Sequence, residues 1–395
     1  MSEIHLTQNE ARRFMLLKQG LLGDYKYTGK NGILEFVRQA GCIQFDPIDV
    51  CGKNAEIVLQ SRISDFTKTM LYELLYVDRK LLDYFDKNLA IIPVENWVYF
   101  EREREQHRTW ERSQDEIKKV RDKVIAAIAE RGPLCSADFD LSQKVDWYWS
   151  STKLSRAALE HLYFSGELAI HHKSGSIKYY DLIENCIPKE ILNQPDPYFC
   201  DYDYKKWCVL QRIGAVGLLW NRASAAWLGI QGLKAKERTN IFSELLSENR
   251  ISAVRVENIS HVLYCRIEDM KLIEIIRGKH SQKQRCEFIA PLDNMMWDRK
   301  LIQVLFGFEY KWEIYTPVED RKYGYYVLSV LYGDNFVGRI EVVADKKVKI
   351  LTVKNIWFEK SVKQTKKLLA EIEKCAKRFA RFNDCESIIW KENLQ

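Results

Sequence analysis

TKLSRAALEHLYFSGELAIHHKSGSIKYYDL, residues 152–182, is where the folding pattern of this chain is clearest. Its first half predicts a helix with Ala158, Leu159 and Leu162 on one side. Its second half predicts a β-hairpin, two strands joined at residues 173–176. Upstream, residues 113–132 predict another amphipathic helix that starts with a Ser113 and Glu116 capping box. A helix, a turn, a second helix and a two-stranded wing make a winged helix, whose second helix usually enters the DNA major groove.

The same order of elements recurs on both sides of this segment. Residues 233–249 predict a helix, and residues 251–258 and 261–268 predict a pair of strands. At the N-terminus, residues 6–20 begin with a Thr7 and Glu10 capping box, and residues 31–41 and 68–85 predict two more helices. We therefore predict three winged-helix (helix-turn-helix) units in tandem.

After about residue 286 the residue pattern becomes typical of β-strands. Aromatic and β-branched residues dominate 312–319, 323–333, 335–345 and 346–359, with Gly-Asp-Asn or Asp-Lys turns between them. A basic helix over residues 359–382 follows. The prediction is an α+β, helix-rich chain with winged helices at 1–110, 111–198 and 199–270, and a C-terminal β-barrel with a terminal helix at 271–395.

Bulk composition sets limits on the class of protein. Hydrophobic residues make up 46% and charged residues 29%, which is typical of a globular protein. The ten cysteines form no CxxC pair, which predicts reduced, mostly buried thiols in a cytoplasmic protein. No apolar run is long enough to cross a membrane, and the start of the chain lacks the layout of an export signal. The net charge is only +6, but residues 346–367 hold eight lysines against one acid, Glu359.

The short motif GCIQFDPID, residues 41–49, raises a question of chemistry. Side chains alternate in extended backbone, so Gln44 and Asp46 point to the same side, and Pro47 disfavours helical backbone at Asp46. One interpretation is a polar strand end before a turn, and the other is a catalytic amide and carboxylate. The motif alone leaves both open.

No set of histidines or acids has a spacing suited to a metal, so we expect neither a metal site nor a cofactor. This argues against a metal-dependent nuclease. A non-catalytic winged-helix DNA-binding regulator is the alternative to an enzyme, although the chain shows no heptad repeat or separate effector domain of the kind that dimeric regulators carry.

Six segments in order resemble the AlkZ/YcaQ family of bacterial DNA glycosylases, which excise bulky alkylated purines and unhook interstrand crosslinks. They are GCIQFDPIDV, SRISDF, YFDKNLAIIP, the 167–182 wing, APLDNMMWDRKLIQVLFGFEY and EDRKYGYYVLSVLYGD. The resemblance covers nearly the whole chain. It implies three winged helices followed by a C-terminal β-barrel, in agreement with the pattern above.

The resemblance also implies roles for particular residues. Gln44 and Asp46 match the catalytic signature, in the Gln-x-Asp version of the YcaQ-like branch. The chain departs from the family where a Trp, a His and a small residue are common, since it has Phe85, Asp86 and Lys87 there. By this resemblance, the role of the His is either lost or moved to Lys87. It also has Ala55 and Glu56 where relatives carry two His. These departures leave the lesion range open.

The implied reaction is monofunctional hydrolysis of the N-glycosidic bond of an alkylated purine, in double-stranded DNA bound by a monomer. Asp46 would stabilise an oxocarbenium-like sugar and activate water, and Gln44 would position that water. DNA contacts are expected at Lys53, Asn54, Ser61, Arg62, Lys153, Arg156, Lys173, Lys178, Arg321, Lys322 and Tyr323. For most of these residues an ordinary solvated surface is an open alternative.

Overall fold

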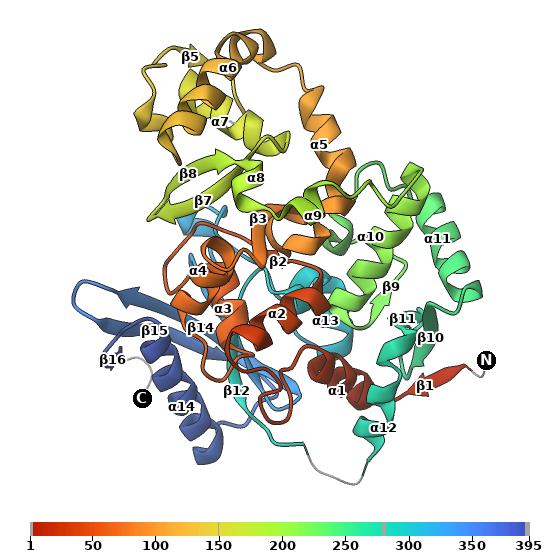
Figure 1. Cartoon of the computed structure of the whole chain (residues 1–395). Helices are drawn as coiled ribbons and strands as arrows, with labels where there is room; N and C mark the ends of the chain where they lie inside the picture. Colours follow the sequence, from red (N-terminus) through yellow and green to blue (C-terminus); the bar gives the residue numbers. More distant parts are fainter. Residues whose placement is uncertain (1–2, 149, 279–281, 392–395) are drawn as a thin grey trace. The chain divides into compact units, whose positions relative to one another are not determined.

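The structure, a computed structural model, describes residues 3–148, 150–278 and 282–391 (Figure 1). The chain forms two compact units. The first contains the chain up to Leu71, Asp86–Leu89 and the chain from Lys205 onward. The second contains Tyr72–Phe85 and Ala90–Tyr204. The predicted N-terminal segment 1–110 is therefore shared by both units.

The N-terminal part of the first unit starts as the sequence predicts. Strand β1 (Ile4–Leu6) leads into helix α1 (Gln8–Lys18), and the Thr7 and Glu10 capping box is confirmed. The Glu10 N–H donates to Thr7 Oγ1 at 3.1 Å, and the Thr7 N–H donates to Glu10 Oε2 at 2.8 Å. Helix α2 (Gly29–Ala40), strand β2 (Ile43–Gln44) and helix α3 (Asn54–Gln60) follow.

A four-stranded sheet in the first unit has the order β1-β10-β11-β9. The predicted helix and strand pair are confirmed as α11 (Ala235–Ser247), β10 (Ile251–Val256) and β11 (Leu263–Arg266). Strand β9 (Leu219–Trp220) completes one edge, and β1 adds in parallel to β10 at the other. Helices α10 (Asp201–Val216) and α12 (Lys271–Arg277) flank these strands in sequence.

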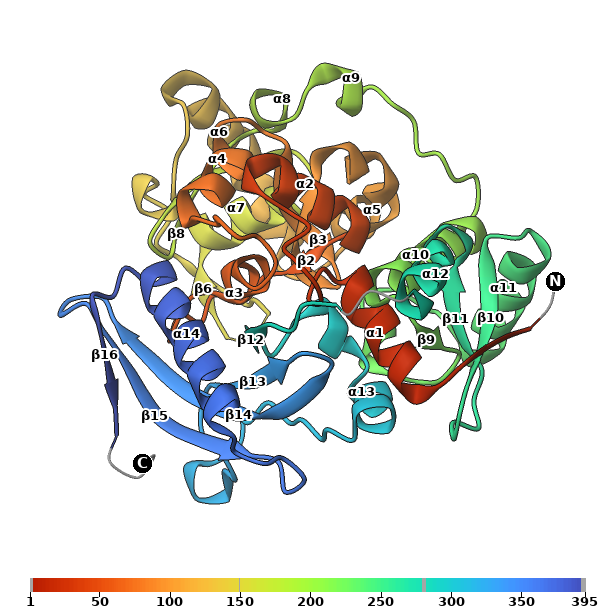
Figure 2. The same cartoon turned by 90° about the horizontal axis from the view of Figure 1, so that it is seen from below.

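The C-terminal strands form an open five-stranded sheet, so the prediction of a closed barrel is wrong. Its order is β12-β13-β14-β15-β16, and β12 and β16 do not pair within the described residues. The strands are β12 (Cys286–Ile289), β13 (Val327–Tyr332), β14 (Asn335–Asp345), β15 (Ile350–Phe358) and β16 (Ser387–Trp390). Helix α14 (Lys366–Phe382) packs on one face of the sheet and contacts both edge strands (Figure 2). Because α14 covers this face from one edge to the other, the sheet does not curl to join them.

Two further details of this sheet differ from prediction. Residues 312–319 form no strand, because the stretch after helix α13 (Arg299–Phe306) is a long loop with a short 3₁₀ turn (Val318–Asp320). Helix α14 begins at Lys366, where the Thr365 hydroxyl accepts the Leu368 N–H at 3.2 Å.

The second unit contains the predicted middle helices and wing. Helix α6 (Gln114–Arg131), helix α7 (Leu154–Phe164) and the antiparallel hairpin of β7 (Leu168–Ser174) and β8 (Ile177–Leu182) are all confirmed (Figure 1). Helix α5 (Glu101–Arg108) packs against α7, and the short strands β5 (Lys144–Val145) and β6 (Thr152–Lys153) pair between α6 and α7. Helices α8 (Ile183–Cys186) and α9 (Lys189–Leu192) follow the wing. The tandem winged-helix arrangement itself stays a prediction.

Two local predictions in this region are wrong. Helix α4 (Lys68–Tyr76) ends early, whereas the sequence pattern predicts one helix over residues 68–85. Arg79 adopts a left-handed φ of 52°, which breaks the helix, and the chain continues as β3 (Leu81–Asp86) and β4 (Asn88–Pro93). Ser113 does not cap α6, because it is also left-handed and its hydroxyl donates to the Asp146 carbonyl at 2.8 Å.

All ten cysteines lie in the described ranges and form no disulfide there, and every one except Cys200 is buried, as predicted. Among the helices of the described chain, none combines the length and the apolar character that crossing a bilayer requires.

Candidate active site

Gln44 and Asp46 lie where β2 ends, in the first unit. The Phe45 N–H donates to the Leu89 carbonyl at 2.9 Å, and Pro47, which has no N–H, stops the pairing. The Gln44 side chain is 6% exposed, whereas Asp46 is half-buried. Asn54 Nδ2 donates to the Gln44 carbonyl at 2.8 Å. The motif thus presents a buried amide followed by a more accessible carboxylate.

The Asp46 carboxylate is held by its own backbone. Its Oδ1 accepts the Ile48 N–H at 2.9 Å, which makes an Asx turn across Pro47. Asp46 forms no ion pair with any residue that the structure describes. Burial raises the pKa of Asp46, and the Ile48 N–H opposes this only in part. The group is therefore a stronger base than an ordinary aspartate, and its negative charge is not neutralised.

Asp49, three residues later, shows the opposite environment. Its carboxylate pairs with Lys346 and accepts the Gly52 N–H at 3.1 Å. Burial alone would raise the pKa of Asp49, but the hydrogen bond and charge of Lys346 outweigh it, and the pKa is lowered. The charge of Asp49 is therefore balanced by Lys346, whereas the Asp46 carboxylate is not used in an ion pair and can act on a substrate.

Lys87 contacts the Gln44 side chain. Its Nζ donates to Gln44 Oε1 at 3.2 Å and lies 5.2 Å from the centre of the Trp297 ring. The residue is 3% exposed, and burial, followed by the charge of Arg212, lowers the pKa of Lys87 to about 8. The lysine sits between β3 and β4, where Asn88 takes the left-handed conformation of a tight turn.

The turn that carries Lys87 is fixed by its neighbours. Asp86 pairs with the buried Arg212, whose guanidinium also lies 5.4 Å from the Trp297 ring. Gly229 packs directly on this turn with a φ of +87°, and a Cβ there would lie 2.0 Å from the Asp86 carbonyl oxygen. Only glycine fits at this position.

Gly229→Ala is expected to destabilise the protein by about 2–4 kcal/mol, because left-handed strain and a backbone clash add together. Gly307→Ala is the matched control. Gly307 has a φ of +65° but nothing within 4 Å of the position that an added methyl group would take, so its cost is the strain alone, about 1–2 kcal/mol. Chemical denaturation of both variants measures the difference, and equal losses would show that the contact with Asp86 carries no energetic weight.

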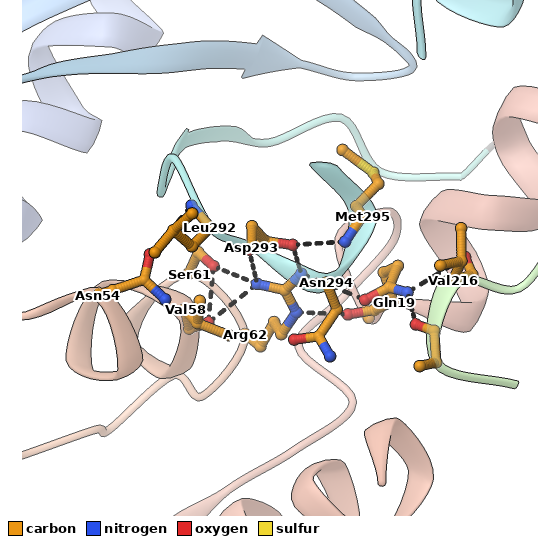
Figure 3. A network of polar contacts seen from close by, with 12 residues as sticks. Gln19, Asn54, Val58, Ser61, Arg62, Val216, Leu292, Asp293, Asn294 and Met295 are labelled. Atoms are coloured by element: carbon orange, nitrogen blue, oxygen red, sulfur yellow. Dashed lines mark hydrogen bonds and ion pairs between the residues drawn. The ribbon is translucent and has the colours of Figure 1, made fainter. Parts of the chain in front are cut away.

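Three of the predicted DNA contacts are buried, which argues against a direct contact with phosphate. Asn54 is 1% exposed, and Ser61 and Arg62 are 0% exposed. Arg62 makes a two-pronged ion pair with Asp293, with both N–O distances 2.8 Å, and its Nε donates to the Gln19 carbonyl at 3.0 Å (Figure 3). The side-chain donors of these residues are already used inside the protein, which favours a role in the fold over a DNA contact.

The other predicted DNA contacts lie at or near the surface. Lys153 and Arg156 are exposed at the start of α7, and Lys53 is partly exposed at the start of α3. In the wing, Lys173 Nζ binds Asp83 Oδ1 at 2.7 Å, so its charge is already balanced, whereas Lys178 is partly exposed with its pKa lowered by burial.

Helix α7 is not free to enter a DNA groove along its length. Among the residues of α7, all of them described, Arg156 alone is exposed, since α5, α6 and β7 pack around the helix. Only its N-terminal end, with Lys153 and Arg156, can meet a phosphate.

The loop before β13 carries Arg321, Lys322 and Tyr323. The buried Glu313 carboxylate accepts the backbone N–H groups of residues 322, 323 and 324 at 3.0, 2.8 and 3.2 Å. Burial raises the pKa of the nearby Tyr326, and the charges of Asp46 and Asp49 add to this effect.

Ala55 and Glu56, the two residues after the Gln-x-Asp motif that differ from the family pattern, have local structural roles. Ala55 is 1% exposed, and Glu56 Oε2 accepts the Lys53 N–H at 3.1 Å at the start of α3. In the described parts of the chain, no three His, Cys, Asp or Glu side chains gather as metal ligands.

Sequence reasoning singles out Lys87 as a departure from the family pattern that could have taken over the role of the family's His, and it misses Arg212 and Trp297. A lysine inside the apolar stretch LLDYFDKNLAIIP is the available signal for Lys87. Arg212 lies 126 residues from Asp86, so no local pattern links them.

Comparisons with known proteins identify the family and the fold of the chain. The family described as DNA glycosylase AlkZ-like matches residues 37–382. The DNA glycosylase AlkZ of Streptomyces sahachiroi has a similar structure, with a TM-score of 0.65, 13% identity, and coverage of 98% of this chain and 100% of that chain. At this identity the structural likeness shows the fold alone. Because the family match spans most of its length, the chain belongs to the AlkZ-like family and is an enzyme that hydrolyses N-glycosidic bonds in DNA.

Proposed function

We propose that this enzyme excises alkylated purines of the N7-alkylguanine type from double-stranded DNA, including bulky adducts and interstrand crosslinks, as the Gln-x-Asp signature implies. It acts as a monomer and leaves an abasic site. The observation that supports this most is the half-buried, unpaired Asp46 carboxylate directly after the buried Gln44 amide.

The chemistry suits such a substrate. Alkylation at N7 places a positive charge on the purine, so the base leaves with the electrons of the C1′–N bond and needs no proton from the enzyme. The sugar becomes oxocarbenium-like as this bond lengthens. A nearby carboxylate stabilises that cation, as in glycoside hydrolysis.

Asp46 serves as that carboxylate and as the base. A water molecule attacks C1′, and its proton passes to Asp46, whose pKa is raised by burial. Gln44 orients the water or the deoxyribose through its amide. Reaction then requires ionised Asp46, so the rate falls as the pH drops through a pKa above the ordinary aspartate value.

Phosphate contacts are proposed for the accessible basic residues on each unit. They are Lys53, Arg321 and Lys322 on the first unit, and Lys153, Arg156 and Lys178 on the second. Tyr323 is proposed as an uncharged contact, and Lys173 as a contact that also pairs with Asp83. Removal of one such contact weakens binding to all sequences alike and reduces the salt dependence by about one counterion.

The test is base release from duplex DNA that carries a single N7-methylguanine, or a nitrogen-mustard crosslink, with the freed base measured by mass spectrometry. We expect the purified enzyme to release the base from both substrates and to leave undamaged duplex intact. Failure on every N7-alkylguanine substrate would contradict the proposed substrate class. Release from the monoadduct but not from the crosslink would restrict the substrate class to lesions on one strand of the duplex.

A further inference from the structure

The contact between Lys87 and Gln44 determines which way the Gln44 amide faces. An ammonium group has three donors and no acceptor, whereas a carboxamide has one acceptor oxygen and one donor nitrogen. With Lys87 Nζ 3.2 Å from the Gln44 side chain, the opposite orientation would place two donors against each other. The oxygen therefore faces Lys87, and the NH₂ group is left to bind something else.

Lys87 is itself held in place on several sides. Its neighbour Asp86 is paired with Arg212, Gly229 closes on the turn, and Nζ lies over the Trp297 ring. These contacts leave the ammonium little freedom to swing away from Gln44. Such preorganisation is what a reacting group requires, because small errors in position reduce the rate steeply.

We propose that Lys87 is a positioning residue for base excision, which holds the Gln44 carboxamide so that its NH₂ group is offered to the attacking water or the deoxyribose. The inference rests on the proposed function and deepens it, because it makes Gln44 a hydrogen-bond donor in the reaction.

The positioning depends on the protonation state of Lys87. A neutral amine can accept as well as donate, so both orientations of the Gln44 amide become allowed once the proton is lost. The pKa of Lys87 is lowered to about 8 by burial and by Arg212 and Arg299, while Cys42 and Asp86 act in the other direction. Burial raises the pKa of the Cys42 thiol, and Asp86 is tied to Arg212, so Lys87 is the group in this cluster that changes charge near pH 8.

The first experiment compares single-turnover base release from an N7-methylguanine duplex between about pH 6.5 and 9, a range that brackets the pKa of Lys87. For the native enzyme we expect the rate constant to fall on the alkaline side with a midpoint at about pH 8. Lys87→Met should be slower by about tenfold, as expected for a lost charge-assisted hydrogen bond, and should show no alkaline fall. Lys87→Arg keeps a donor-only cation, so it should retain the rate within a few-fold and also lose the alkaline fall.

Lys283→Met, at an exposed lysine paired with Asp24, is the control for the loss of one positive charge and should match the native enzyme. The melting temperature of each variant, measured alongside, separates slow chemistry from poor folding.

The second experiment is a double-mutant cycle with Gln44→Ala. If Lys87 acts through Gln44, the double variant is no slower than Gln44→Ala alone. If Lys87 only stabilised the fold, the fold-reductions in rate of the two single variants would multiply in the double variant. Multiplicative losses, or a Lys87→Met enzyme with the native rate and alkaline fall, would overturn the inference. Absence of base release by the native enzyme would instead overturn the proposed function.

Discussion

Asp46→Asn should slow base release roughly 10²–10³-fold at pH 7 without loss of the fold. Asparagine has the same shape, and its Oδ1 can still accept the Ile48 N–H, so the Asx turn survives. The substitution removes the negative charge that faces the cationic sugar and the base that takes the proton from water. Single-turnover release from an N7-methylguanine duplex measures the loss.

The same substitution should not lower stability, and this sets it apart from a misfolded variant. Burial raises the pKa of Asp46 above the ordinary 3.8, so the folded state binds the proton more tightly than the unfolded state. The ionised carboxylate therefore costs stability at every pH above its folded pKa, and this cost disappears as the pH falls below 3.8. Neutral asparagine removes the cost, so we expect a melting temperature at pH 7 equal to or above that of the native enzyme.

Asp49→Asn is the matched control, since it makes the same chemical change three residues away. Asp49 is paired with Lys346, and its pKa is lowered, so its removal should cost some stability and little activity. An Asp46→Asn enzyme with the native rate, or an Asp49→Asn enzyme that is equally slow, would remove Asp46 from the mechanism.

Local patterns are sufficient to predict much of the fold. Short stretches of sequence are enough to predict the helical spacing of apolar residues in α6 and α7, the turn between β7 and β8, and the Thr7 and Glu10 capping box. The errors arise where contacts distant in sequence decide the outcome. Leu81–Asp86 has helix-like apolar spacing, but it becomes a strand once Arg79 breaks the helix. Whether the last sheet closes depends on where α14 packs, and strand propensity carries no information about that.

The candidate site likewise has a part that local sequence predicts and a part that depends on residues distant in sequence. Gln44 and Asp46 are close in sequence and belong to one motif, so the motif and the family resemblance are enough to single out both. The environment that gives them their chemistry is non-local. Arg212 and Trp297 reach the Gln44 segment from far along the chain, and a basic residue close to the motif gives no sign of whether it faces DNA or a buried acid.

Arg62 illustrates that ambiguity and allows the second large prediction. Arg62→Met is expected to destabilise the protein by about 3–5 kcal/mol, because Asp293 would remain buried without a counter-charge. The buried carboxylate would keep the Met295 N–H at 3.0 Å but lose both 2.8 Å contacts from the guanidinium (Figure 3). Urea denaturation of the full chain, followed by tryptophan fluorescence, measures the loss.

Arg156→Met separates this structural role from DNA binding, because Arg156 is itself exposed and its buried partner Glu160 keeps the hydrogen bond that Trp147 Nε1 donates at 2.7 Å. Its cost should be smaller than that of Arg62→Met, because Glu160 is not left without a donor, while the salt dependence of DNA binding falls by about one counterion. Arg62→Met combined with Asp293→Asn should recover part of the lost stability, since the unpaired buried charge is gone and the Met295 N–H keeps an acceptor. Should Arg62→Met leave stability unchanged and reduce the salt dependence instead, Arg62 would be a DNA contact after all, because a buried ion pair has no means of sensing salt around a bound duplex.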